Sequence, residues 1–209
     1  PFSSDLPDLP DLQDLPDLPD LRDLRGGGAL PSSPMDAAGL LRASIRDPNP
    51  VVYLQAAGRG GELGDVPDEE FVIELGKAAR LRNGEDLTIV AIGAMVRPAL
   101  RSVDFHNTKG VSIELIDPRT LVPLDKEMIF KSVRKTGRLI IVDEARDTCS
   151  AASHIASLCA EECFSALKAP IKRVTVNDIA IPYSPPLEKN VLPNEERINN
   201  AVSEVLDFA

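Results

Sequence analysis

The pattern of apolar and polar positions is clearest around a predicted strand–helix–strand unit in the middle of the chain. An apolar, β-branched run at 111–116 predicts a buried strand, and Pro118 ends it because proline cannot donate to a strand ladder. Asp125 stands at the N-cap of a predicted helix, and Gly137 follows its basic last turns as the stop. A strand at 139–142 completes a βαβ unit, whose parallel strands imply a right-handed crossover.

Two more strands are predicted before this unit. Residues 77–81 and 87–92 are expected to form a hairpin, because Asn83-Gly84 suits the positive φ angles of a type I′ turn. The first arm would be the antiparallel strand of an otherwise parallel sheet. A helix with one apolar stripe follows, and His106 is expected to lie in a loop.

The helix and strand signals continue to the C-terminus. Residues 150–167 predict a helix whose apolar stripe carries Cys159 and Cys163. Their i, i+4 spacing would suit half a metal site, but their place on the apolar stripe favours buried core thiols. The remaining predicted elements are a strand at 171–176, an extended proline-rich segment at 182–187 and a terminal helix capped by Asn194. Together the elements predict an α/β fold with three layers and a five-stranded, mostly parallel sheet that has one antiparallel strand.

The N-terminal part has a different composition. Residues 1–35 repeat the triplet Asp-Leu-Pro, which predicts an extended, disordered tail, either simply solvated or acting as an acidic partner-binding arm. A helix at 36–47, capped by Asp36, and a strand at 51–54 are expected next. Gly58–Pro67 lacks the glycine spacing of a phosphate loop, so a hinge is favoured over a phosphate cradle. The predicted division is a tail (1–35), a helix–strand pair (36–57), a linker (58–76) and an α/β domain (77–209).

Composition excludes several classes of protein. The net charge is −10, and seven aspartates against two arginines in the first 35 residues supply half of it, so no basic nucleic-acid footprint is present. No apolar run approaches the length of a membrane span. Three cysteines without framework spacing indicate a reducing compartment, and no secretory signal is visible. The chain begins with proline rather than methionine, as expected of a fragment or a processed product.

Candidate chemistry is sparse. Asp143 and Glu144 are expected at the carboxyl end of a central strand, where open α/β sheets place their sites. Adjacent carboxylates could serve acid–base chemistry, but neighbouring side chains on an extended chain point in opposite directions, which favours a structural or interface role. Neither His106 nor His154 has a base or ligand motif beside it. The residues alone therefore predict no catalytic constellation.

Several motifs occur in the order of a known family. The segment 116–125 reads Ile-Asp-Pro-Arg-Thr-Leu-Val-Pro-Leu-Asp, and it is followed by Val-Asp-Glu-Ala at 142–145 and Ile-Pro-Tyr-Ser-Pro-Pro-Leu-Glu at 181–188. This series resembles transketolase-type C-terminal domains. More narrowly, it resembles the β subunit of the thiamine-diphosphate-dependent component of 2-oxo acid dehydrogenase complexes, over a match from about Asp36 to the end. Residues 148–152 are most similar to acetoin dehydrogenase β subunits.

The resemblance implies a role in assembly. Such domains contact an α subunit and a second β subunit in a heterotetramer and help to dock the dihydrolipoyl acyltransferase core. The candidate interface residues are Asp143, Glu144, Lys168 and Phe208. Pyruvate-type relatives often carry an acid at the position of Lys168, so docking to a basic acyltransferase domain is expected to be weakened. A protein of this family would be cytoplasmic in a bacterium, or in the mitochondrial matrix or plastid of a eukaryote.

The resemblance also bears on the cofactor. Thiamine diphosphate and magnesium act in the full family complex, but the family's catalytic groups belong to the preceding pyrimidine-binding domain. No bound cofactor, catalytic residue or decarboxylase activity is therefore expected of this chain alone. Two other functions stay open, a non-catalytic assembly or regulatory module derived from that subunit and an independent small-ligand binder. The helix–strand pair at 36–55 lacks its own sheet, so it is expected to fray or self-associate rather than to dock on the C-terminal domain.

Overall fold

The computed structural model describes residues 26–56 and 63–208. Its main body is a five-stranded sheet in the order β3-β5-β4-β7-β8, in which only β3 is antiparallel to its neighbour. The strands are β3 (Ala79–Arg82), β4 (Leu87–Ala91), β5 (Ile113–Asp117), β7 (Leu139–Arg146) and β8 (Lys172–Val176). The predicted five-stranded, mostly parallel α/β sheet is confirmed.

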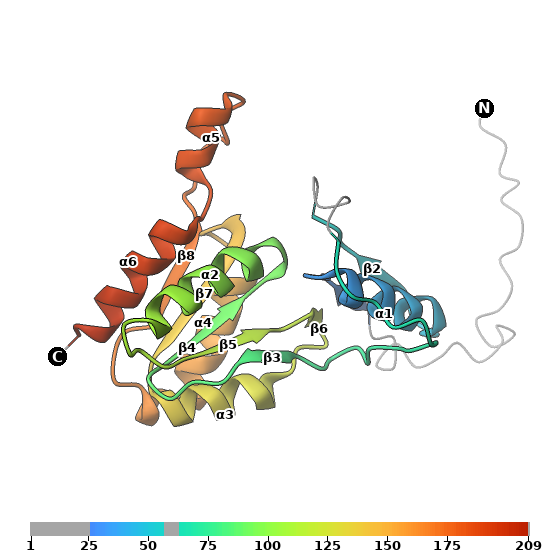
Figure 1. Ribbon diagram of the computed structural model, residues 1–209, viewed down its shortest axis with the longest axis horizontal. Coiled ribbons are helices and arrows are strands. Elements are labelled where there is room, and N and C mark those ends of the chain that lie inside the picture. The colour runs from blue at the N-terminus through green and yellow to red at the C-terminus, as the bar shows by residue number, and fades with distance from the viewer. Residues whose placement is uncertain (1–25, 57–62, 209) are drawn as a thin grey trace, which may run out of the picture.

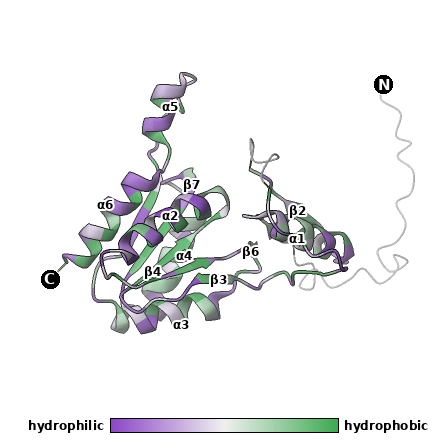
Figure 2. Cartoon of the chain, in the orientation of Figure 1, coloured by the Kyte–Doolittle hydropathy of each residue, from purple (hydrophilic) through white to green (hydrophobic). Residues whose placement is uncertain are grey.

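Helices cover both faces of this sheet (Figure 1). The helices α2 (Val96–Asn107) and α6 (Glu195–Leu206) share one apolar cluster with the sheet. The helices α3 (Lys126–Thr136) and α4 (Ala151–Glu162) share the cluster on the opposite face. Figure 2 shows the amphipathic character of α6, whose apolar residues Ile198, Ala201, Val202 and Val205 are buried. The three predicted layers are thus present.

The predicted caps of the central βαβ unit are confirmed. The Asp125 carboxylate accepts the N–H of Met128 at the start of α3, and Gly137 ends the helix with a left-handed φ of 75°. Ser150 and Asn194 cap α4 and α6 in the same way, each accepting the N–H three residues further on. Cys159 and Cys163 are both buried as free thiols, in accordance with the core interpretation.

The predicted hairpin is wrong. β3 pairs with β5 instead of β4, because the chain crosses over β5 after β3 and enters the sheet one strand further in. Gly84 makes this crossing possible, since a Cβ atom there would lie 2.1 Å from the backbone of Ile113 and Glu114. The Asn83-Gly84 pair therefore provides close backbone approach rather than a type I′ turn.

Two other segments are helical where the sequence suggested otherwise. α2 continues to Asn107, so His106 lies in its last turn and is 5% exposed rather than in a loop. The segment expected to be extended at 182–187 instead enters helix α5 (Pro185–Val191). Proline is compatible with the first helical positions because their N–H groups have no partner inside the helix, so Pro185 and Pro186 start α5. Two 3₁₀ helices, η1 (Gly93–Met95) and η2 (Phe164–Ala166), complete the α/β domain.

A second, smaller sheet lies at one end of the molecule (Figure 1). It has the order β2-β1-β6 and contains β1 (Gly27–Ala29), β2 (Val51–Tyr53) and β6 (Thr120–Val122). β1 is parallel to β2 and antiparallel to β6, so it connects the N-terminal segment to the α/β domain. The tail predicted for 1–35 is therefore too long, because residues 27–29 form a strand; residues 1–25 lie outside the described ranges.

Helix α1 (Pro34–Arg46) covers this small sheet, and its cap is Ser33 rather than the predicted Asp36. The Ser33 hydroxyl accepts the N–H of Asp36, which places Asp36 in the first helical turn. Leu40 is fully buried, but Ile45 is 75% exposed. The small core beneath α1 contains Ala29, Leu40, Tyr53, Phe71, Ile73 and Leu75. Part of the predicted linker thus packs against the helix.

Candidate functional site

Asp143 and Glu144 point to different surroundings, as expected for neighbours on a strand. Asp143 is 4% exposed, and its two carboxylate oxygens accept the N–H groups of Ala145 and Ala152 at 3.0 and 3.2 Å. This carboxylate therefore fixes the turn between β7 and α4. Glu144 is exposed. Of the two, only Glu144 presents its side chain at the surface.

Glu144 lines a cavity at the carboxyl end of β7. The cavity has a volume of about 300 Å³, and its other lining residues are Leu30, Pro31, Leu54, Gln55, Ala56, Gly93 and Ala94. It lies where open α/β sheets usually bind ligands, at the carboxyl ends of parallel strands. Here the N-terminal segment supplies one wall, so this sheet edge is partly covered by residues that precede the α/β domain.

Lys168 and Phe208 lie elsewhere. The Lys168 N–H donates to the carbonyl of Gly137 at 2.7 Å, which places Lys168 beside the amino end of β7, away from Asp143 and Glu144. Its ammonium lies 3.4 Å from the Thr136 carbonyl at the C-terminus of α3. Phe208 follows α6 and is 50% exposed. The four candidate interface residues therefore do not form one cluster.

A buried polar cluster holds the N-terminal segment against the α/β domain. We call Ser32, Asp36, Asp117 and Arg119 the polar joint. The Arg119 Nε atom lies 2.8 Å from Oδ1 of Asp36, and the Ser32 hydroxyl contacts both Asp36, at 3.2 Å, and Asp117. The Arg119 N–H donates to Asp117 at 2.8 Å, and Arg119 has a left-handed φ of 59°. Burial raises the pKa of Asp117 to about 6, although the Ser32 and Arg119 hydrogen bonds oppose it.

The polar joint was not predicted from the sequence. Asp117 and Arg119 belong to the motif at 116–125, which does not indicate a contact with the N-terminal segment, and Asp36 was expected to be a helix cap. One local pattern pointed to part of this arrangement. Asp36 lies three residues after Ser33 at the start of a helix, a spacing at which the aspartate carboxylate can accept a hydrogen bond from the serine hydroxyl. The contact between residues 85 positions apart, Ser32 and Asp117, depends on the docking of the small sheet.

A second buried charge lies within β5. Glu114 is fully buried, and its carboxylate meets Lys135 of α3 and, at 3.5 Å, Arg80 of β3. Burial alone would raise the pKa of Glu114, but the Lys135 and Ser132 hydrogen bonds and the charges of Lys135 and Arg80 outweigh it and lower that pKa. The ion pairs of Glu114 with Lys135 and Arg80 link α3 to β5 and β3, so the three charges stabilise the fold.

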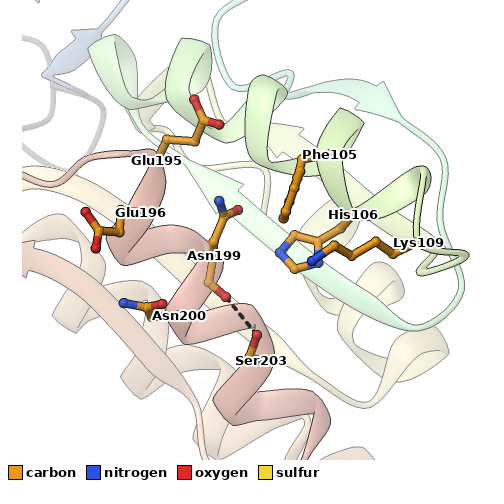
Figure 3. A pocket seen from close by; sticks show the side chains of 8 residues that line it. All are labelled: Phe105, His106, Lys109, Glu195, Glu196, Asn199, Asn200 and Ser203. Carbon is orange, nitrogen blue, oxygen red and sulfur yellow. Dashed lines mark hydrogen bonds between the residues drawn. The ribbon is translucent and has the colours of Figure 1, made fainter.

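A hollow of about 530 Å³ lies between the end of α2 and α6. Figure 3 shows the side chains that line it. Phe105, His106 and Lys109 line one side, and Asn199 and Ser203 line the other. Burial, followed by the charge of Lys109, lowers the pKa of His106, which therefore stays neutral near pH 7. The Lys109 ammonium lies 4.1 Å from the centre of the Phe105 ring. The hollow lies where α2 contacts α6.

Comparison with known proteins identifies the family. The model for the transketolase C-terminal domain matches residues 76–198. The chain belongs to the transketolase C-terminal domain family. None of the helices in the described ranges combines the length and the apolar character needed to cross a membrane.

The curated relatives of this transketolase C-terminal domain include β subunits of dehydrogenases. The acetoin:2,6-dichlorophenolindophenol oxidoreductase subunit beta of Bacillus subtilis is 43% identical over 177 residues, which cover 85% of this chain and 52% of the relative. The pyruvate dehydrogenase E1 component subunit beta of the same organism is 40% identical over 180 residues, covering 86% and 55%. The 2-oxoisovalerate dehydrogenase subunit beta is 38% identical over 182 residues, covering 86% and 55%. The chain thus spans about half the length of the curated relatives it matches.

A solved structure has the same fold. It is described as a split-gene transketolase, an inactive β4 tetramer, with a TM-score of 0.75 and 25% identity; the match covers 88% of this chain and 59% of that one. The residues matched to the transketolase C-terminal domain include Asp117 and Arg119 but not Ser32 or Asp36. The polar joint therefore connects the family domain to the segment before it.

Proposed function

We propose that this chain is the C-terminal assembly part of a pyruvate- or acetoin-type dehydrogenase β subunit. It supports association with an α subunit and a second β subunit, and docking to a dihydrolipoyl acyltransferase core, instead of carrying the chemistry itself. The 43% identity to the acetoin-type β subunit supports this assignment. The best support within the structure is the segment that contains α5.

The α5 segment projects from the α/β domain (Figure 1). None of the α5 residues is buried, although the whole helix lies within the residues matched by the family model. The apolar side chains of the segment are exposed to 47% at Ile179, 47% at Ile181, 103% at Tyr183 and 55% at Leu187. A series of exposed apolar side chains on a projecting segment is typical of a surface that a partner covers.

In this proposal, thiamine diphosphate and magnesium do not bind to this chain. In the ranges that the structure describes, no three His, Cys, Asp or Glu side chains gather where they could hold a metal ion. Thiamine diphosphate and magnesium belong to the complete family assembly, where they supply the covalent carbon chemistry. The role proposed for this chain is to bind and orient neighbouring subunits.

The test is association with an α subunit, for which the α subunit that accompanies the B. subtilis acetoin relative is a suitable probe. Sedimentation velocity of the mixture should show a complex at tens of micromolar protein. Tyr183→Ser combined with Leu187→Ser should weaken it at least tenfold, because aromatic and large apolar side chains dominate interface energies. Phe164→Ser is the control, since Phe164 is 77% exposed but lies on η2 instead.

Two results would overturn the proposal. One is the absence of any complex between the α subunit and a wild-type chain that is shown to be folded by circular dichroism. The other is equal binding by the wild type and the Tyr183 and Leu187 double variant, which would remove α5 from the interface.

A further inference from the structure

We propose that the outer edge of β2 is a self-association surface, on which a second copy of this chain pairs antiparallel about a two-fold axis at Val52. In the described ranges β2 is an edge strand, because only β1 pairs with it. An edge strand presents unpaired backbone groups that favour pairing with another strand. In the small sheet β1 separates β2 from β6, so β6 does not cover the outer edge of β2.

The hydrogen bonds to β1 define which backbone groups face outward. The Gly27 N–H donates to the Pro50 carbonyl at 3.0 Å, and the Leu54 N–H donates to the Ala29 carbonyl at 2.9 Å. In a parallel ladder this register turns the N–H and C=O groups of Val51 and Tyr53 away from β1. Antiparallel pairing centred on Val52 sets Val51 of each copy opposite Tyr53 of the other. Each such pair exchanges two hydrogen bonds, so all the outward groups of the strand are used.

The side chains of the edge favour this pairing. The segment 48–56 contains no charged residue, so it lacks the charged side chains that usually protect an edge strand. Val52 is 60% exposed and Leu54 is 51% exposed. Both lie on the face opposite Tyr53, which packs under α1. At the two-fold axis the two Val52 side chains would meet directly on this face.

Helix α1 carries a matching apolar flank. The Tyr53 hydroxyl donates to the Ala37 carbonyl at 2.9 Å, which places the Ala37 side of α1 over β2. Leu41 and Ile45 follow at successive i+4 positions and therefore continue along that flank. They are 44% and 75% exposed.

Pairing across β2 also gives the two helices a suitable spacing. α1 contacts both β1 and β2. With strands about 4.8 Å apart, the two α1 axes would lie roughly 10 Å apart, the distance at which helices pack. The same operation thus completes the sheet and covers the exposed flanks of both helices.

A cysteine at the axis gives the sharpest test. In a non-hydrogen-bonded antiparallel pair the Cα atoms are about 4.5 Å apart, which is within disulfide range. Val52→Cys, made together with Cys149→Ser to remove the exposed native thiol, should oxidise to a covalent dimer. Val122→Cys in the same background is the control, because Val122 is similarly exposed, at 54%, and shares the face but lies two strands from the axis. Equal cross-linking of the two variants would overturn the proposal.

Oligomeric state and amide exchange provide independent readouts on the unmodified chain. The wild type should sediment as twice 22.5 kDa, and Val52→Lys should weaken the dimer at least tenfold. The Val51 and Tyr53 amides should exchange slowly in the dimer and at least tenfold faster in the Val52→Lys variant. A monomer at about 100 µM, or a ladder of larger species from open-ended pairing, would contradict two-fold pairing. A failure to bind the α subunit would not affect the dimerisation result, because β2 lies in the small sheet whereas α5 projects from the α/β domain.

Discussion

Arg119 Nε lies 2.8 Å from the Oδ1 atom of Asp36, and this ion pair joins two parts of the chain that are 83 positions apart in sequence. The two side chains are 19% and 5% exposed. The Nε–H bond does not point at the oxygen, so the contact is ionic rather than a hydrogen bond. It holds the first turn of α1 against the turn between β5 and β6. This docking corrects the expectation that the helix–strand pair would fray.

Breaking this ion pair should release the N-terminal segment. Arg119→Asn is the suitable change, because asparagine tolerates the left-handed φ of 59° better than other uncharged residues except glycine. Loss of one partner of a largely buried pair costs about 3 kcal/mol, so α1 should open more often. Trypsin should then cut after Arg42 and Arg46 well before it cuts within 87–206. In the wild type, cleavage after Arg42 and Arg46 should not precede cleavage within 87–206.

Arg46→Asn is the matched control for this experiment, tested by cleavage after Arg42. Its ion pair with Glu70 is exposed at both ends, and such pairs contribute little. Early cleavage within α1 of the wild type itself would restore the fraying interpretation. Equal resistance of the wild type and Arg119→Asn would show that strand pairing alone holds the segment.

The polar joint also contains one hydroxyl between two carboxylates. Ser32 lies within hydrogen-bonding distance of both Asp36 and Asp117, but its hydroxyl can donate only one proton. Both contacts are hydrogen bonds only if one carboxyl group is protonated. The raised pKa of Asp117, about 6, identifies it as the group that takes up the proton.

Stability should therefore depend on the protonation of Asp117. Since its pKa is raised by folding from 3.8 to about 6, the folded chain binds this proton more tightly than the unfolded chain. The contribution is favourable at low pH and is lost between about pH 4 and pH 6, with a total of about 3 kcal/mol. Asp117→Asn should stabilise the chain at pH 7.5 and change little at pH 4, measured by urea unfolding at each pH. A difference between wild type and variant that does not vary with pH would rule out titration of Asp117.

The sequence predicted the α/β domain well because its signals are local. Asp125, Gly137 and Asn194 stand at caps whose geometry depends on only a few neighbouring residues. The hairpin prediction failed because Asn-Gly is typical of a turn. Gly84 is instead required because the backbone of β5 lies too close to it for a side chain. The local sequence does not show which residues will be approached closely by a backbone segment that is distant in sequence.

The polar joint and the small sheet could not be predicted for the same reason. Gly27–Ala29 follows a low-complexity repeat and has no strand signal of its own, yet it pairs with β2 on one side and β6 on the other. Glu114 interrupts an apolar run, yet it is fully buried. Its compensating charges come from β3 and α3, so only the tertiary structure shows how it is accommodated.

Lys135→Met should be strongly destabilising because it removes the main partner of the buried Glu114. Arg80 remains, but its Nε is 3.5 Å away. Removing one member of such a pair leaves an uncompensated carboxylate and should lower the free energy of unfolding by about 3 kcal/mol. Lys172→Met is the control, since its partner Glu204 is 58% exposed and the loss should stay within about 0.5 kcal/mol. Similar urea midpoints for the two variants would show that Arg80 compensates Glu114 alone.

Lys168 has two separable effects that charge reversal should reveal. Its ammonium lies 3.4 Å from the Thr136 carbonyl at the negative end of the α3 dipole. Lys168→Glu should therefore cost about 0.5 to 1 kcal/mol of stability. The same change should strengthen binding to a basic subunit-binding domain of an acyltransferase, because it replaces repulsion with attraction and raises the association rate.

Lys168→Met separates the loss of the lysine from the gain of an acid. It removes the interaction with the α3 terminus without adding a negative charge, so its stability should lie between those of the wild type and Lys168→Glu. In surface plasmon resonance the association rate should rise from wild type through Lys168→Met to Lys168→Glu, and the differences should shrink as salt is added. If the three association rates are equal, Lys168 does not face the acyltransferase, and its role is confined to the end of α3.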